Sequence, residues 1–103
     1  MNKLDRTGLS SHSIKKIQHV FSHYPEIKKV YLYGSRAKGN YQTGSDIDLS
    51  IISDNFNYTQ LIKLEMELDD LLLPHKLDIN LFKNIKNTEL TAHIKRCGII
   101  FYP

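Results

Sequence analysis

The sequence has a single cysteine, Cys97, and no long apolar run. One cysteine cannot form an intrachain disulfide, so nothing in the chain requires an oxidising compartment. No segment approaches the roughly 18 apolar residues of a membrane-spanning helix, and the polar start MNKLDRTGLSSHS lacks the apolar core of a secretory signal. We therefore expect a cytoplasmic protein that does not associate with a membrane.

The chain also lacks internal repeats, low-complexity tracts and Pro/Gly-rich linkers. Its 103 residues, 41% hydrophobic and 24% charged, are typical of one folded domain, which we place at residues 1–103. The formal net charge of +3 permits nucleic acid or phosphorylated ligands. No aromatic residues alternate with the lysines as base stacking would require, and we do not expect nucleic acid as a partner.

Hydrophobic periodicity predicts alternating helices and strands. Candidate helix caps are Ser10 or Ser11, Asp54 or Asn57, and Thr88. The fold class is therefore α/β (α+β), a small mixed sheet flanked by helices, whose strand order the pattern does not reveal. The predicted helices cover residues 10–25, 57–73 and 88–97, the strands cover 28–34, 46–52, 76–82 and 99–102, and a polar loop with a short helical turn at its start covers 36–45.

Two carboxylates stand one residue apart in the strand DIDLSII. Asp46 and Asp48 share one face because alternate side chains of a strand point the same way, while Ile47, Leu49 and Ile51 face the core. Like charges this close raise the pKa of one carboxyl unless a cation neutralises them, and oxygen ligands suit magnesium. Asp78 stands opposite the apolar face of KLDINLF. If the two strands are neighbours, three carboxylates meet and suffice for two Mg²⁺ ions in phosphoryl or nucleotidyl transfer.

A Gly-Ser pair follows the preceding strand. Gly34 lets the backbone approach a ligand closely, and Ser35 offers a hydroxyl. If the next residues begin a helical turn, their free N–H groups form an anion site, and Arg36 adds positive charge. Together these features suit the triphosphate of a nucleotide whose other oxygens are bridged by metals on the aspartates.

Three other phosphate or metal motifs fail. An EF-hand loop starting at Asp46 requires glycine and glutamate where Ile51 and Asn57 stand. A Walker loop requires lysine and Ser/Thr where Asn40 and Tyr41 stand. In haloacid-dehalogenase-type phosphatases the Asp-x-Asp pair ends an apolar strand, whereas here the apolar residues follow the pair.

The spacing of the two motifs has a known counterpart. Gly34-Ser35, ten residues, and Asp46-Ile47-Asp48 resemble the signature of the nucleotidyltransferases of the DNA polymerase beta superfamily. The stretch GSRAKGNYQTGSDIDL is especially similar to the minimal nucleotidyltransferases. The resemblance covers most of the chain and implies the polymerase-beta-like nucleotidyltransferase fold.

The resemblance also implies residue roles. Gly34 and Ser35 would hold the nucleotide phosphates, and Asp46 and Asp48 would ligate the metals. Asp78 would complete the site and activate the attacking hydroxyl. The predicted nucleotide-binding residues are Gly34, Ser35, Arg36, Gly44 and Ser45, of which the last two would shape the turn before Asp46, and the predicted catalytic and metal-binding residues are Asp46, Asp48 and Asp78.

Minimal members of this family are paired with a helical protein of the HEPN class, often an RNase toxin, and some transfer AMP from ATP to a tyrosine of that partner. The resemblance therefore implies a magnesium-dependent antitoxin that adenylylates a HEPN-type toxin within a hetero-oligomer. Because no acceptor-binding domain is visible and the motif around Asp78 is short, a second hypothesis stays open. It is a non-catalytic antitoxin, with or without bound nucleotide, that neutralises its partner by contact alone.

Overall fold

Helices and strands alternate along the chain in the predicted order. A computed structural model of the protein describes residues 3–103. The strands are β1 Lys29–Tyr33, β2 Ile47–Ile52, β3 Leu77–Leu81 and β4 Ile99–Tyr102. The α-helices are α1 Ser11–Phe21, α2 Ser35–Lys38, α3 Tyr58–Asp69 and α4 Thr88–Cys97, and two short 3₁₀ helices are η1 Lys3–Arg6 and η2 Phe82–Asn84.

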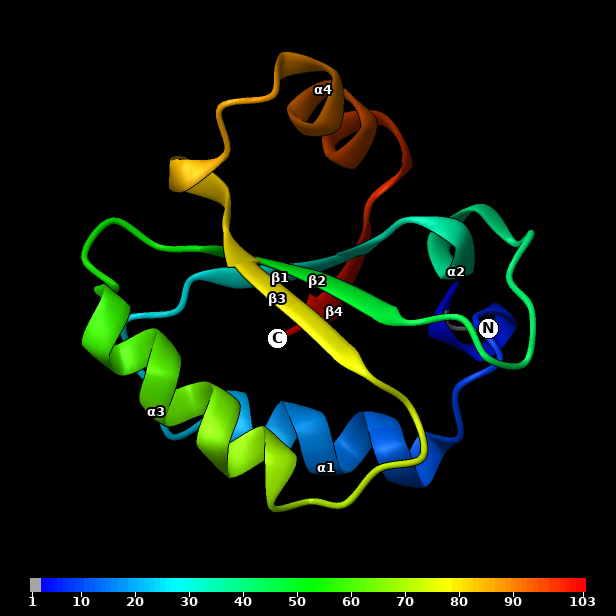
Figure 1. The fold of residues 1–103 in the computed structure, drawn as a ribbon, viewed down its shortest axis with the longest axis horizontal. Coiled ribbons are helices and arrows are strands. Elements are labelled where there is room, and N and C mark those ends of the chain that lie inside the picture. The colour runs from blue at the N-terminus through cyan, green and yellow to red at the C-terminus, as the bar shows by residue number, and fades with distance from the viewer. Residues whose placement is uncertain (1–2) are drawn as a thin grey trace.

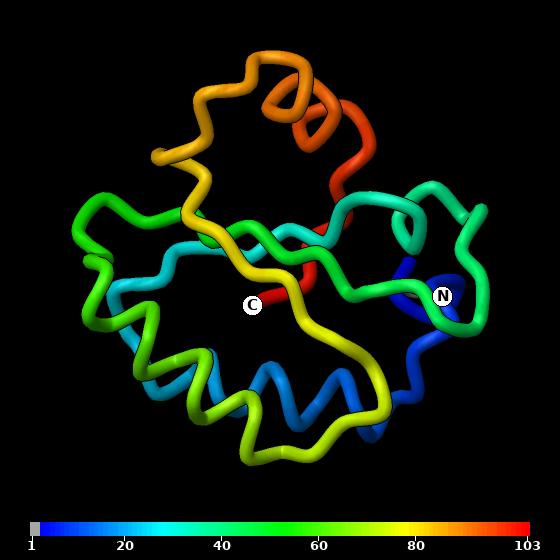
Figure 2. The backbone as a smooth tube through the Cα atoms, in the orientation of Figure 1, coloured from blue at the N-terminus to red at the C-terminus, as the bar shows by residue number. Residues whose placement is uncertain are grey.

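The four strands form one sheet in the order β3-β2-β1-β4. β1 is antiparallel to both of its neighbours, whereas β2 and β3 are parallel because α3 crosses over between them. Figure 2 follows the chain from β3 through η2 and α4 and back into β4. The predicted small mixed sheet is confirmed, and the structure supplies the strand order.

One face of the sheet is apolar and covered. α1 and α3 lie side by side below it in Figure 1. Burying one aliphatic or aromatic side chain contributes about 1.5–3 kcal/mol to the stability of the fold. The burial of many such side chains on this face determines which way the strands face. The most deeply buried members of this core are Ile17, Phe21, Val30, Leu32, Ile47, Leu49, Ile51 and Leu64.

The opposite face is polar near the centre of the sheet and partly covered by α4, which stands above it in Figure 1. Ile94 is the buried contact of that helix. No helix within residues 3–103 is long and apolar enough to cross a membrane.

The helix ends test the predicted caps. The side chain of Ser10 accepts the N–H of Ser13, and Asn57 forms a reciprocal capping box with Gln60. The prediction for the last helix was wrong, because Asn87 and not Thr88 is its N-cap. Asn87 has an extended backbone, and its side-chain oxygen accepts two N–H groups of the first turn.

The guanidinium of Arg36 joins the N-terminal segment to the loop before β2. The residue is 2% exposed, and its Nη1 donates to the carbonyl of Thr7 at 2.8 Å. Nε and Nη2 donate to the carbonyl of Ser45 at 3.2 and 3.0 Å. The Tyr41 ring centroid lies 5.0 Å from the guanidinium carbon. The buried charge is stable here because backbone oxygens accept its protons.

Replacing Arg36 by lysine should destabilise the fold. One ammonium cannot reach both carbonyls as the planar fork does, so at least one buried carbonyl loses its donor. We expect Arg36→Lys to lower the free energy of unfolding by about 2–3 kcal/mol in urea titrations. Lys38→Ala, an exposed change on the same short helix, should stay within about 0.5 kcal/mol. Equal stability of the two variants would contradict the role of the fork.

Candidate active site

Strand register brings the two motif carboxylates of β2 and β3 together. Asp48 pairs with Asp78 across the parallel β2–β3 ladder, and Tyr33 of β1 is its partner on the other side. These three side chains therefore share the polar face of the sheet. Asp46 stands two residues before Asp48, just ahead of β2, and is exposed. The condition stated from the sequence, that the two strands be neighbours with aligned faces, is met.

The surroundings of Asp48 strongly disfavour the negative charge of its carboxylate. Its partial burial, and then the charges of Asp78 and Asp46, raise its pKa from 3.8 to about 6. Each cause disfavours a negative charge at this position. The fold thus holds Asp48 where a cation would be stabilising.

Below the carboxylates, the next residues of the same face form a hydrogen-bonded row. Ser50 Oγ donates to Asn80 Oδ1 at 2.7 Å, and Asn80 Nδ2 donates to Tyr33 Oη at 2.7 Å. Burial, and then the Asp48 charge, raise the pKa of Tyr33, which stays a neutral phenol. The row joins three strands and holds the floor of the site in one geometry. Sequence reasoning gave Ser50 and Asn80 no role, although their period-two spacing from Asp48 and Asp78 signalled it.

Gly34 occupies a position that requires glycine. Its φ is 77° and its ψ is −154°, a region that residues with a Cβ avoid. A Cβ built there would lie 2.4 Å from Oδ2 of Asp48. The strand end therefore approaches the carboxylate through the missing side chain, and Ser35 begins α2 directly afterwards.

His93 was not singled out from the sequence, and the fold places it at the site. The N–H of Gly34 donates to its Nε2 at 3.1 Å, and the Tyr33 ring meets the imidazole edge-on with centroids 6.2 Å apart. Because Nε2 accepts this bond, the proton of the neutral ring lies on Nδ1. No local pattern in α4 announced this contact, since it depends on how α4 packs on the sheet.

The remaining predicted nucleotide-binding residues lie in and around the loop before β2. Arg36 is committed to the carbonyls of Thr7 and Ser45, so it braces the loop, and its predicted contact with nucleotide stays a prediction. Ser45 Oγ accepts the N–H of Gln42 at 2.9 Å within the turn before Asp46, and its predicted contribution to nucleotide binding stays a prediction. Gly44 has open space around its Cα and an ordinary backbone conformation, so nothing there requires glycine.

The carboxylates of the site suit magnesium only if another group, such as a substrate phosphate, also binds the ion. Among residues 3–103, no group of three or more His, Cys, Asp or Glu side chains is arranged to hold a metal by itself. Magnesium keeps waters and uses one or two carboxylates plus substrate phosphates. The excess negative charge that raises the Asp48 pKa fits such a cation. Asp46 and Asp48 would hold it, with Asp78 beside them.

Substituting Gly34 should test the close approach to Asp48. We expect Gly34→Ala to lower the free energy of unfolding by about 2–4 kcal/mol, because the Cβ adds a backbone penalty of about 1–3 kcal/mol and a steric conflict with the carboxylate. Gly44→Ala is the matched control and should change stability by less than about 0.5 kcal/mol. Urea titration of both variants makes the comparison, and a tolerated Gly34→Ala would refute the constraint.

The raised pKa of Asp48 predicts a pH-dependent stability change. The folded protein disfavours the ionised carboxyl, so stability is lost as pH rises from the unfolded value of 3.8 through about 6. In EDTA at pH 8, Asp48→Asn should stabilise the protein by about 1 kcal/mol, less than the full shift implies because solvent screens the partly exposed group. Near pH 3, below the unfolded pKa, the two proteins should unfold at the same urea concentration. A gain that is independent of pH would show another origin.

Comparison with known proteins agrees with this geometry. Residues 15–103 match the family model described as polymerase beta, nucleotidyltransferase. Among solved structures, a toxin-antitoxin complex with AMP-PNP superposes with a TM-score of 0.68 at 22% identity, over 90% of this chain and 73% of that chain. A complex of tri-AMPylated Shewanella oneidensis HEPN toxin with MNT antitoxin gives 0.66 at 19% identity, over 90% and 71%.

These structural similarities show the fold. No curated protein matches the sequence. The family match extends over most of the chain and contains the Gly-Ser turn and all three aspartates. The chain therefore belongs to the polymerase beta nucleotidyltransferase family.

Proposed function

We propose that this protein is a magnesium-dependent adenylyltransferase that transfers AMP from ATP to a tyrosine hydroxyl of a HEPN-type toxin and so acts as its antitoxin. The observation that carries the proposal is the in-register pair of Asp48 and Asp78, with Asp46 beside them and the Gly34 turn against them. Family membership supports nucleotidyl transfer. The two structural neighbours, one with AMP-PNP and one with an AMPylated toxin, support ATP and a HEPN-type partner.

In this proposal the two ends of the site divide the binding of ATP. The turn after Gly34 binds the β- and γ-phosphates with backbone N–H groups at the start of α2 and the Ser35 hydroxyl. Asp46 and Asp48 would hold magnesium at the other end of the site. When bound, magnesium supplies charge neutralisation at the phosphate oxygens. The hydrogen-bonded row of Ser50, Asn80 and Tyr33 holds the neighbouring residues of the same face in one geometry.

The transfer itself exchanges one phosphorus–oxygen bond for another. The acceptor oxygen forms a bond to the α-phosphorus while the bond to the bridging oxygen breaks, and pyrophosphate leaves. Asp78 takes the hydroxyl proton, since it is exposed on the polar face beside Asp48. Because Asp46 and Asp78 are both exposed, a hydroxyl carried by another protein can reach the site.

The test is transfer of labelled AMP. The purified protein is incubated with labelled ATP, magnesium and its proposed HEPN-type partner. We expect label on that partner, and a loss of at least about 100-fold in the rate for Asp48→Asn and for Asp78→Asn. Asp5→Asn, an exposed change in η1, is the matched control and should retain the rate. An unlabelled partner would refute the proposal.

The contact-only alternative predicts a different result in cells. If neutralisation depends on binding alone, Asp48→Asn should protect cells from the toxin as well as the unchanged antitoxin does. If adenylylation is the mechanism, this variant should bind the toxin in pull-down assays and still fail to protect. Cell growth during toxin expression measures the difference.

A further inference from the structure

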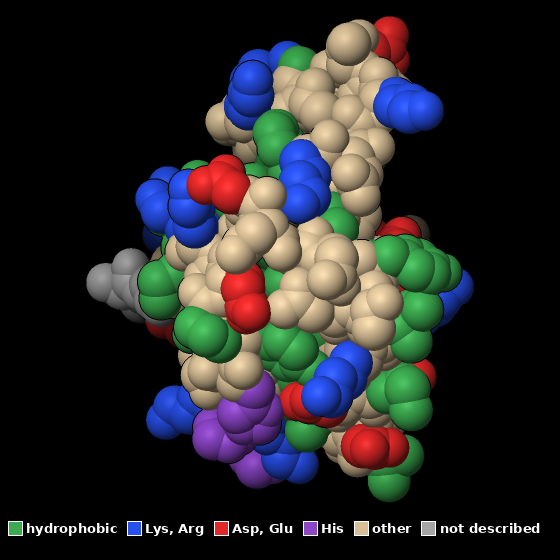
Figure 3. All heavy atoms as spheres, turned by 90° about the vertical axis from the view of Figure 1, so that its left-hand side faces the viewer, with side chains coloured by type: hydrophobic (Ala, Val, Ile, Leu, Met, Phe, Trp, Pro, Cys, Tyr) green, Lys and Arg blue, Asp and Glu red, His purple; other side chains and the backbone are tan. Residues whose placement is uncertain are grey.

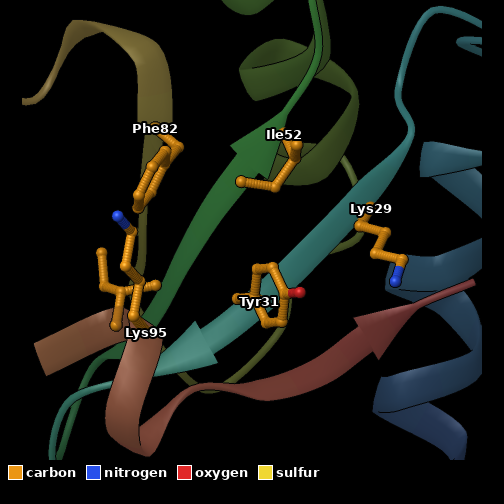
Figure 4. Close-up of a pocket in the computed structure, with 6 residues that line it drawn as sticks. Lys29, Tyr31, Ile52, Phe82 and Lys95 are labelled. Carbon is orange, nitrogen blue, oxygen red and sulfur yellow. The ribbon is translucent and has the colours of Figure 1, made fainter. Parts of the chain in front are cut away.

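An apolar groove lies on the polar face of the sheet, beyond the carboxylates. It encloses about 300 Å³ between the sheet and α4. Figure 4 shows Tyr31 and Ile52 at its floor and Phe82 at one side. The buried Ile94 of α4 also lines it. Nothing in the chemistry proposed above uses these side chains. The lining residues are Lys29, Tyr31, Ile52, Phe82, Ile94 and Lys95.

The groove and the phosphate-binding turn lie at opposite ends of the site. In the antiparallel β1–β2 pair, Tyr33 is opposite Asp48 and Lys29 is opposite Ile52. Gly34 therefore follows the end of β1 that lies beside Asp48, while the groove lies where β1 begins and β2 ends. Four residues separate Asp48 from Ile52, which is about 13 Å along a strand. The carboxylates thus stand between the Gly34 turn and the groove.

This order suits the direction of the reaction. In an in-line displacement the attacking oxygen approaches the phosphorus from the side opposite to the leaving group. If pyrophosphate leaves toward the Gly34 turn, the acceptor hydroxyl enters from the side of the groove. A polypeptide that carries this hydroxyl would extend over Ser50 and Asn80 toward Phe82.

Charge indicates what kind of polypeptide fits. Lys29 and Lys95 are exposed, and Figure 4 shows them on opposite sides of Tyr31 and Ile52. Asp54, which follows β2, is already paired with Lys28. Figure 3 views this edge of the molecule and shows more Lys and Arg than Asp and Glu side chains over its upper half. The apolar floor between two free ammonium groups is complementary to an apolar side chain with acidic neighbours.

We propose that the groove binds an extended segment of the acceptor protein, with an apolar side chain between acidic residues, about four residues from the hydroxyl that receives AMP. The spacing follows from the 13 Å between Asp48 and Ile52 at roughly 3.3 Å per extended residue. This inference rests on the proposed transfer to a protein hydroxyl. It adds a docking site and the chemistry of the segment that occupies it.

Binding is measured first, without any reaction. The probe is a fluorescein-labelled synthetic peptide with a tyrosine and, four residues away, a leucine between two aspartates. Its anisotropy should saturate with wild-type protein, and Lys29→Glu and Lys95→Glu should each weaken the affinity about tenfold. Lys15→Glu, an exposed change on α1, should leave it unchanged. Both charge reversals are at exposed positions and should not impair folding.

Two outcomes of this measurement overturn the groove proposal. One is the lack of a saturable change up to about 1 mM protein. The other is an equal response of the Lys15 control and the groove variants. A peptide with lysines in place of its aspartates should fail to bind, and its binding with the same affinity would equally contradict the charge argument.

The second measurement uses transfer of AMP to the HEPN-type partner. Lys29→Glu and Lys95→Glu should raise KM for the acceptor about tenfold and leave KM for ATP unchanged. A raised KM for ATP would assign the groove to the nucleotide and overturn the inference. Wild-type protein that binds the peptide but transfers nothing would refute the proposed function and leave the docking site standing, so the two failures are distinguishable.

Discussion

The packing of β2 determines the rest of the structure. Three of its apolar residues, Ile47, Leu49 and Ile51, are fully buried beneath the sheet, so the alternate residues must face the other way. Parallel pairing with β3 then sets Asp78 beside Asp48, and antiparallel pairing with β1 sets Tyr33 on the other side. A slip of one residue in either ladder would move the carboxylates into the apolar core.

The site contains unfavourable interactions, and the stability of the surrounding fold compensates for them. Partial burial and two neighbouring carboxylates destabilise the charge of Asp48, and Gly34 accepts an unusual backbone conformation against it. The hydrogen-bonded row of Ser50, Asn80 and Tyr33 contributes order beneath them. Unfavourable charge and backbone conformation of this kind are typical of sites that bind a charged ligand. The bound ligand offsets the electrostatic cost that persists in the free protein.

Three features lie one after another along the polar face of the sheet. The Gly34 turn, the carboxylates and the apolar groove follow one another along β1 and β2, so phosphates, reaction centre and acceptor segment would lie in sequence across one sheet. α4 contributes to both ends of this series, through His93 at the turn and Ile94 at the groove. A change in the position of α4 would therefore affect the turn and the groove together.

The sequence by itself determined the local features. Period-two alternation placed Asp46, Asp48 and Asp78 opposite the apolar residues, and the Gly-Ser to Asp-x-Asp spacing indicated the family. The N-cap Asn87 was missed because Asn87 and Thr88 are both good capping residues and local pattern does not choose between them. Contacts between distant segments were decided only by the tertiary structure. They include the strand order, the bracing of the loop by Arg36, the bond from Gly34 to His93 and the groove beneath α4, because each depends on how strands and helices pack rather than on neighbouring residues.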